Sequence, residues 1–329
     1  MAKAPEAAVH TGGDVDGILN YQAADVERVW TKRDGAGSDM SLDGAVWDSR
    51  RVLVRNGREQ RDLTLDTAGF ALLPDEKGAH IDYYDEHSVV HTYYKDCESL
   101  LKGVTGATHC YAFDHNIRST SGNASGRRLR GGNLVQGPAG LVHGDYTATS
   151  APKRLALLAQ PPKLNDALRP VLGEKPLLPA ALADEALRQG RRFAFINVWR
   201  PISTVQCKPL ACCDASTVAS DDLLVFEIHY SDRVGENYFA RHRSSHRWNY
   251  FPSMTRDEVL LLKQWDSDGA LDATCLPSGI VGQLHALWRY AVGGRKPATF
   301  SLHSAFEDPS SPAGCPDRES IEVRCVLIY

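Results

Sequence analysis

The chain has 329 residues, of which 43% are hydrophobic and 24% are charged, and its formal net charge is −4. These values are ordinary for a globular protein, and without a basic excess nothing recommends nucleic acid as a partner. No apolar run approaches the roughly 20 residues that a membrane-spanning helix needs, and the first residues lack the apolar core of a signal peptide. We therefore expect a cytoplasmic enzyme with a small-molecule substrate, no membrane partner and an oligomeric state that the sequence leaves open.

The N-terminal part of the sequence gives the weakest structural signal. Residues 1–20 are expected to form a flexible tail, and residues 21–329 a single domain with a mixed N-terminal elaboration. Residues 21–75 combine short apolar pieces with Gly, Asp and Arg, and they show no periodicity that assigns them to helix or strand.

Residues 89–107 predict the first clear helix. Apolar side chains recur near helical spacing from Val89 to Leu101. Gly103, with Gly106 close behind it, is typical of a helix C-terminus.

A strand is expected at residues 108–119, then a mobile, Gly-rich, basic loop at 121–140 and a helical region at 164–191. After that the chain becomes a series of short β-like runs separated by Pro, Gly, Asp and Ser. The runs are residues 192–202, 209–217, 223–232, 236–243, 246–252, 259–267, 298–306 and 320–329. This order predicts a mainly β fold with flanking helices: a double-stranded β-helix, that is, a cupin-like jelly roll.

The eight cysteines include no Cys-x-x-Cys pair. In a cytosolic protein such residues are most simply reduced and buried as small hydrophobic side chains. Cys212 and Cys213 are adjacent, so on a strand they should point to opposite faces.

Two His-x-Asp pairs occur, and their surroundings differ. His80 and Asp82 lie in a highly charged stretch just before a predicted helix, where Asp85 is a candidate N-terminal cap. A surface role explains that pair. His143 and Asp145 instead open the β-rich half, where residues two apart on a strand share one face.

A histidine and a carboxylate on one face suit a metal site. The facial triad of iron(II) oxygenases combines two histidines with one carboxylate and leaves positions open for substrate and oxygen. His303, in the run 298–306, is the candidate for the second histidine. Such an enzyme that uses 2-oxoglutarate must also hold the distal carboxylate of that acid.

Arg318 and Ser320 are candidates for that anchor, because a guanidinium fork matches a carboxylate and a hydroxyl two residues away shares its face. If the last two strands form a hairpin centred near residues 310–311, Arg318 lies across from His303. At roughly 3.3 Å per residue, Arg324 lies about 20 Å further along. An edge strand with a solvated polar face remains an alternative interpretation of the same pattern.

Several stretches together resemble the gibberellin-desaturase-like group of fungal hydroxylases and desaturases, which also includes a bacterial cephamycin 7-methoxylation component. They cover most of residues 80–329 and occur in the family's order. They are VTGATHCYAFDHNIR (104–118), VHGDYT (142–147), INVWRPI (196–202), PLACCDAS (209–216), HRWNYFPSMTRDEVLLLKQWDS (246–267), LHSAFEDP (302–309) and RESIEVR (318–324).

The resemblance implies a non-heme iron(II)- and 2-oxoglutarate-dependent oxygenase on a double-stranded β-helix. It implies iron ligation by His143, Asp145 and His303, and contacts of Arg318 and Ser320 with 2-oxoglutarate. The two adjacent cysteines, Cys212 and Cys213, depart from the pattern of the family, and we attach no function to this difference.

Alternation along two strands suggests further pocket residues. On one strand Asn197 and Trp199 oppose Arg200, which is expected to reach a carboxylate in the pocket or to form a buried ion pair. On another strand Trp248 and Tyr250 share a face, as substrate lining or as aromatic core. We include Arg200 among the co-substrate residues and the other four among the substrate residues.

The expected reaction removes hydrogen from a small organic molecule, giving hydroxylation, desaturation or oxidative cyclisation with iron(II), 2-oxoglutarate and O2. A carboxylate at Asp145 disfavours halogenation, because a halide needs that coordination position. Two alternatives stay open: a cupin-like metal-dependent isomerase or hydrolase that does not use 2-oxoglutarate, and a non-catalytic small-molecule binding barrel.

Overall fold

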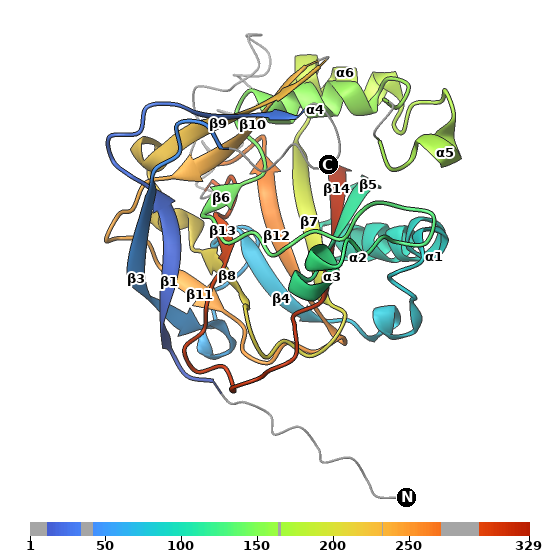
Figure 1. The fold of residues 1–329 in the computed structure, drawn as a ribbon. Helices are drawn as coiled ribbons and strands as arrows, with labels where there is room; N and C mark the ends of the chain where they lie inside the picture. Colours follow the sequence, from blue (N-terminus) through green and yellow to red (C-terminus); the bar gives the residue numbers. More distant parts are fainter. Residues whose placement is uncertain (1–11, 34–41, 164–165, 232, 271–295) are drawn as a thin grey trace, which may run out of the picture.

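The computed structural model describes residues 12–33, 42–163, 166–231, 233–270 and 296–329. Their strands form two sheets, and the helices lie outside these sheets (Figure 1). Strand is the main regular structure, as the sequence predicts.

The smaller sheet has five strands, all antiparallel, in the spatial order β4-β12-β7-β14-β5. The three central strands are buried along almost their whole length. Both of their faces are therefore covered, which explains why apolar residues predominate in their sequences. The strands are β4 (Phe70–Pro74), β12 (Glu258–Asp266), β7 (Phe193–Pro201), β14 (Ser320–Ile328) and β5 (His109–Arg118).

The larger sheet has nine strands in the order β1-β3-β11-β8-β13-β6-β10-β9-β2. Two of its pairings, β11 with β3 and β2 with β9, are parallel. The strands are β1 (Val15–Gln22), β2 (Val29–Arg33), β3 (Trp47–Asn56), β6 (His143–Gly144), β8 (Leu210–Cys213), β9 (Leu223–Tyr230), β10 (Val234–Ala240), β11 (Trp248–Tyr250) and β13 (His303–Ala305).

The chain path between the sheets is that of a double-stranded β-helix. From β5 to β8 successive strands alternate between the five-stranded and the nine-stranded sheet, and they alternate again from β11 to β14. Each crossing brings side chains of both sheets to a shared interior. The predicted jelly roll is therefore confirmed.

One continuous helical segment, residues 86–105, packs against β5 and β14 (Figure 1). It comprises α1 (Glu86–Ser88), the π-helical turn η3 (Val89–Tyr93) and α2 (Tyr94–Thr105). The carboxylate of Asp85 accepts a hydrogen bond from the backbone N–H of Ser88, so the predicted cap is confirmed.

The end of this helix differs from the sequence-based expectation. Gly103 lies inside α2, and the helix ends at Gly106, which has the left-handed φ of +71° and donates its N–H to the carbonyl of Lys102. Only a residue without Cβ adopts that conformation at little cost, so the second glycine is the stop signal.

The remaining helices are short. They are η1 (Gly57–Glu59), η2 (Glu76–His80), α3 (Thr120–Ala124), α4 (Ser150–Leu158), α5 (Arg169–Leu172), α6 (Ala180–Gln189), η4 (Ala215–Thr217) and η5 (Ser220–Asp222). None of the helices in the described ranges is long and apolar enough to cross a membrane.

Two expectations about flexible segments need correction. Strand β1 begins at Val15, inside the stretch expected to be a tail; residues 1–11 lie outside the described residues. The Gly-rich stretch 121–140 contains part of α3, and its backbone bonds to neighbouring segments at Gln136 and Arg130. Backbone hydrogen bonds thus hold this stretch against the rest of the domain at both residues.

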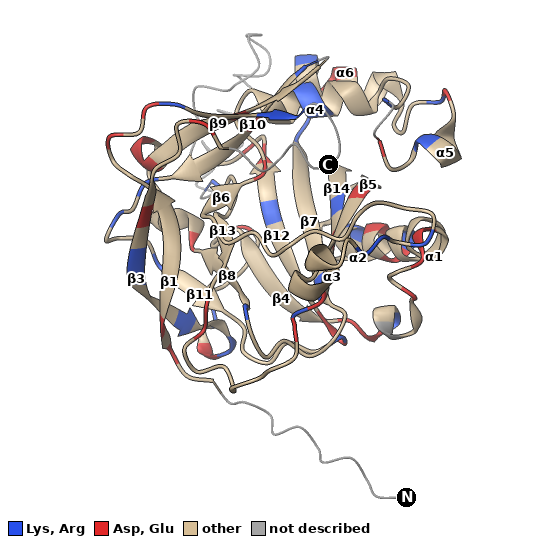
Figure 2. Ribbon diagram, viewed as in Figure 1, with Lys and Arg blue, Asp and Glu red and all other residues tan. Residues whose placement is uncertain are grey.

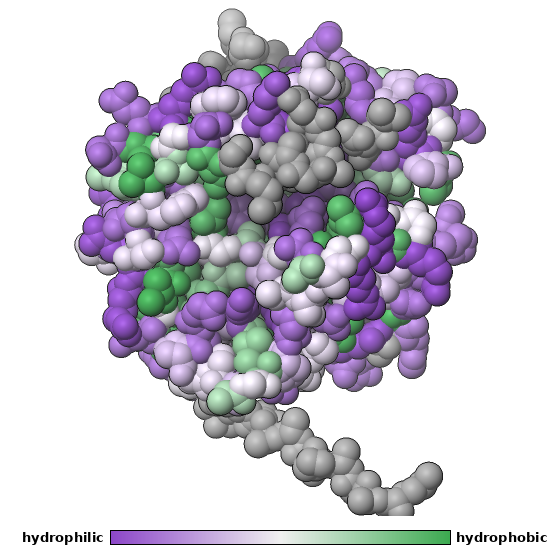
Figure 3. Space-filling view, in the orientation of Figure 1, coloured by the Kyte–Doolittle hydropathy of each residue, from purple (hydrophilic) through white to green (hydrophobic). Residues whose placement is uncertain are grey.

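Cys212 and Cys213 pack in different hydrophobic clusters, on opposite faces of β8, as predicted. Every cysteine in the described ranges is a free thiol, and five of them are buried; Cys275 lies outside those ranges. Lys and Arg are interspersed with Asp and Glu along the chain (Figure 2), and hydrophobic residues on the visible face form small separate groups (Figure 3).

The two glycines of α2 give a matched test of where the helix ends. We expect Gly106→Ala to lower the free energy of unfolding by about 1 kcal/mol, because alanine is strained at positive φ. Gly103→Ala should raise it by up to about 1 kcal/mol, because a Cβ there meets nothing and alanine is the better helix former. Urea unfolding of both variants measures the difference; changes of the same sign would place the helix end elsewhere.

Candidate metal centre

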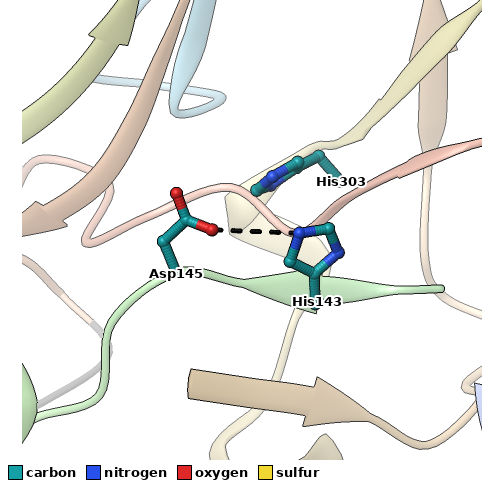
Figure 4. A group of neighbouring side chains, drawn as sticks. All are labelled: His143, Asp145 and His303. Atoms are coloured by element: carbon teal, nitrogen blue, oxygen red, sulfur yellow. Dashed lines mark ion pairs between the residues drawn. The ribbon is translucent and has the colours of Figure 1, made fainter. Parts of the chain in front are cut away.

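His143, Asp145 and His303 come together although 160 residues separate the two histidines in sequence. His143 begins β6, Asp145 directly follows it, and His303 begins β13, the strand next to β6. His143 and His303 are direct cross-strand partners, with ring centroids 4.3 Å apart. One ligand atom from each of the three residues lies within 4.8 Å of the other two (Figure 4).

Backbone carbonyls orient both imidazoles. We assign Nδ1–H of His143 as the donor to the carbonyl of Leu141 at 2.7 Å, and Nδ1–H of His303 as the donor to the carbonyl of Ser301 at 3.3 Å. This tautomer leaves Nε2 unprotonated on each ring, which is the usual arrangement of a metal-binding histidine.

The carboxylate of Asp145 is held from the opposite sheet. Asn197 on β7 donates its side-chain N–H to Oδ2 at 2.9 Å, and Nε of Arg324 on β14 lies 3.6 Å from the same oxygen. The other oxygen, Oδ1, lies 3.8 Å from Nε2 of His143, on the side of the two rings. One oxygen is therefore fixed by the protein while the other faces the prospective ligand position.

The protonation states suit a cation. Burial, followed by the charge of His303, lowers the pKa of His143 to about 4, and burial also lowers the pKa of His303. Burial alone would raise the pKa of Asp145, but Arg324 and the two histidines more than reverse this and lower it. At neutral pH the site presents two neutral imidazoles and one carboxylate, the donor set of a two-histidine, one-carboxylate triad.

A small cavity adjoins the triad, and both sheets line it. Its walls are Arg118, Ala139, His143, Trp199, Leu210, His303, Ala305, Arg318 and Glu322. Of the expected pocket residues, Trp199 and Arg318 are therefore present.

Two donors in this region are buried and have no hydrogen-bond partner: Nε of Arg318 and the hydroxyl of Ser320. Both side chains are 1% exposed. Nη1 of Arg318 donates to the carbonyl of Lys208 at 2.7 Å, and its guanidinium carbon lies 5.7 Å from the ring centre of Trp199. Packing and one backbone bond thus fix the guanidinium while part of its fork stays unsatisfied.

Arg200 does not reach the cavity. It points to the other face of β7, where it forms an ion pair with Asp75 and donates from Nε to the hydroxyl of Tyr93 at 2.9 Å. The sequence had left this choice open, and the buried ion pair is the outcome. The co-substrate role expected for Arg200 is therefore wrong.

Trp248 and Tyr250 belong to the aromatic core and not to the cavity beside the triad. The indole N–H of Trp248 donates to the hydroxyl of Tyr21 at 2.7 Å, and the hydroxyl of Tyr250 donates to the carbonyl of Gly13 at 2.9 Å. The structure thus favours the core interpretation for Trp248, whereas Tyr250 also lines a separate cavity that none of the triad residues lines. Asn197, also expected to contact substrate, contacts the carboxylate of Asp145 instead.

The assumed hairpin is wrong as well. Strand β13 lies in the nine-stranded sheet and β14 in the five-stranded sheet, so His303 and Arg318 meet across the interior and not along a hairpin. Because the polar face of β14 points inward from the middle of its sheet, the solvated edge-strand alternative also fails. Arg324, expected far from the site, lies beside Asp145.

The surface interpretation of the other His-x-Asp pair is confirmed. His80 is exposed at the end of η2, and the carboxylate of Asp82 pairs with Arg130 at 3.0 Å.

Sequence reasoning missed two charged residues of the cavity, Arg118 and Glu322. Arg118 could have been found from the sequence, because Asp114, Asn116 and Arg118 alternate with Phe113, His115 and Ile117 along the predicted strand. Such alternation within a buried strand indicates a polar interior face.

Comparisons with known proteins agree with this geometry. A family profile described as "Oxidoreductase/YMDC permease-like domain" matches residues 19–172, 174–279 and 289–328. Hydroxylase/desaturase CTB9 of Cercospora beticola is 30% identical over 250 residues, which cover 70% of this chain and 70% of that protein. The Fe(II)/2-oxoglutarate-dependent dioxygenase nvfI of Aspergillus novofumigatus is 28% identical over 289 residues, which cover 85% of this chain and 84% of that protein.

The solved structure of the iron and alpha-ketoglutarate-dependent endoperoxidase NvfI matches this fold with a TM-score of 0.68 at 22% identity, covering 96% of this chain and 98% of that chain. By its profile the chain belongs to the oxidoreductase/YMDC permease-like family, and by its sequence relatives it belongs to the hydroxylases/desaturases that depend on iron(II) and 2-oxoglutarate.

Proposed function

We propose that His143, Asp145 and His303 bind iron(II), and that Arg318 and Ser320 bind the distal carboxylate of 2-oxoglutarate. The enzyme then oxidises a small organic molecule, in the manner of secondary-metabolite biosynthesis, by hydroxylation, desaturation or oxidative cyclisation. Free, mostly buried thiols favour a reducing cytoplasmic setting for this activity. We further propose that residues 21–329 act as one domain, with β1 added to it.

The observation that carries the proposal is the pair of unsatisfied donors, Nε of Arg318 and the hydroxyl of Ser320. A buried donor without a partner costs about 1–3 kcal/mol, and more when it is charged. A carboxylate bound between them removes that cost. A metal-dependent isomerase or hydrolase on the same barrel would have no use for this feature.

Each residue then has a defined task. Iron(II) and 2-oxoglutarate, when bound, would activate O2, which supplies the oxidising power: one oxygen atom goes into succinate as the oxo acid loses carbon dioxide, and the other oxidises the substrate. Asn197 and Arg324 fix the carboxylate of Asp145, so the third ligand position is filled by the protein. Trp199 forms a wall of the cavity and holds the guanidinium of Arg318 in place.

The function is tested by anaerobic titration of the protein with iron(II) and then 2-oxoglutarate. We expect the weak visible charge-transfer band of the iron chelate, and succinate formation once O2 is admitted. Iron binding without the band and without succinate would indicate a metal enzyme of another class. No iron binding at all would indicate a binding barrel.

We expect His143→Ala and His303→Ala each to abolish stoichiometric iron(II) binding and turnover while the fold survives, because each removes one of three protein ligands. Bound iron after gel filtration and thermal unfolding measure the two properties. His80→Ala, from the exposed His-x-Asp pair, is the control and should bind iron as the wild type does. Normal iron content in His143→Ala or in His303→Ala would show that the substituted histidine is not an iron ligand.

We expect Asn197→Ala to weaken iron(II) binding by about 10- to 100-fold, as is typical when a residue that orients a metal ligand is lost. Asn249→Ala is a matched control, because Asn249 is also a buried strand asparagine but lies on β11. Competition with a chelator gives both affinities. Unchanged iron affinity in Asn197→Ala would return this residue to the substrate role.

We expect Arg318→Ala to weaken 2-oxoglutarate binding by about 30- to 1,000-fold, which corresponds to about 2–4 kcal/mol for a charge-assisted contact. Arg318→Lys should recover only part of the affinity, because an ammonium does not reproduce the fork. Arg324→Ala should instead weaken iron binding, because its guanidinium faces Asp145. Titrations of iron and of 2-oxoglutarate, made separately, distinguish these effects; a larger loss of 2-oxoglutarate affinity in Arg324→Ala would reverse the assignment.

A further inference from the structure

The cavity contains a second guanidinium to which no task has yet been assigned. Arg118 is the last residue of β5 and is the direct cross-strand partner of Ser320 on β14. Cross-strand partners have their side chains on the same face, about 5 Å apart at Cβ. The side chain of Arg118 therefore leaves its strand beside Ser320, and it lines the same cavity as Arg318.

The known contact of Arg118 leaves its charge uncompensated. Its Nη1 donates to the carbonyl of Gly137 at 2.9 Å, which holds the side chain in place. In the part of the chain that the structure describes, no carboxylate lies within ion-pair distance of Arg118 or of Arg318. Burial, and next the charge of Arg118, lower the pKa of Arg318 to about 10. Two neighbouring cations, Arg318 buried and Arg118 half-buried, are typical of a site for an anion.

At the other end of this inward face of β14, near Asp145, carboxylates outnumber cations. There the guanidinium of Arg324 lies within 2.8 Å of Asp114, 3.3 Å of Glu322 and 3.6 Å of Asp145. Three carboxylates thus surround one cation at the triad, and one of them, Glu322, also lines the cavity with Arg118 and Arg318, where cations outnumber carboxylates. A divalent metal compensates the first end and a dicarboxylate anion compensates the second.

We propose that Arg118 is a second anchor for the distal carboxylate of 2-oxoglutarate, which it binds together with Arg318 and Ser320. This inference rests on the proposed function. The position opposite Ser320 favours the co-substrate over the primary substrate as the partner of Arg118, because the hydroxyl and both guanidiniums then surround one carboxylate. With iron(II) and 2-oxoglutarate bound, both guanidiniums that line the cavity among the described residues would be paired.

The test compares two oxo acids under anaerobic conditions with iron(II) present. The first is 2-oxoglutarate, and the second is 2-oxobutyrate, which has the same chelating head and lacks the distal carboxylate. We expect Arg118→Ala to weaken 2-oxoglutarate binding by about 10- to 100-fold in calorimetric titration and to leave 2-oxobutyrate binding unchanged. Arg118→Lys should recover part of the loss. Arg128→Ala, at an exposed position in the following loop, is the control and should match the wild type for both acids.

The outcomes separate this inference from the proposed function. Unchanged 2-oxoglutarate affinity in Arg118→Ala, or equal losses for both acids, would overturn the role of Arg118 while the wild type still binds 2-oxoglutarate. Failure of the wild type to bind 2-oxoglutarate more tightly than 2-oxobutyrate would instead overturn the co-substrate assignment itself. Thermal unfolding and iron content of Arg118→Ala confirm that the variant is folded and loaded.

Discussion

The contact between the two sheets at Asp145 is the constraint on which the site depends. Asp145 belongs to the chain directly after β6 in one sheet, yet Asn197 and Arg324, which hold its carboxylate, belong to the other. A metal site built this way requires the sheets to keep their spacing and register. The buried aromatic and aliphatic side chains that fill the rest of the jelly roll keep that spacing, because a close-packed interior deforms little.

Because side chains alternate along a strand, β5, β7 and β14 present polar residues to the interior on one face and apolar residues to the helical segment on the other. On β14 the side chains of Ser320, Glu322 and Arg324 face the interior, where they lie beside residues of β5 and β7. The intervening Ile321 and Val323 pack against the helical segment on the outer face. The polar face is buried and yet not fully paired, which is unfavourable for stability unless ligands complete it. Incomplete pairing on this face is therefore the feature on which the proposed ligand contacts rest.

The sequence was sufficient for the parts of the site that depend on local geometry. The two-residue spacing of His143 and Asp145 and the alternation of β14 follow from strand periodicity alone. It was insufficient where both faces of a strand are buried, because alternation then does not tell which face meets the cavity. For that reason the sequence does not decide whether Arg200 meets the pocket. Arg324 was expected far from the site for another reason, the assumed hairpin of β13 and β14, which belong to different sheets.

The two ends of the cavity differ in charge. Its metal end has an excess of carboxylates around Arg324, and its far end has the unpaired guanidiniums of Arg118 and Arg318. A dicarboxylic oxo acid bound in reverse would still place a carboxylate at the two cations, but it would offer the metal end a carboxylate without the neighbouring oxo oxygen, and it could not chelate. The two cations therefore hold one carboxylate in place, and the chelating oxo acid end decides the orientation. In the proposed site the oxo group would face the metal, and the position of the primary substrate would be left to the remaining walls around Trp199.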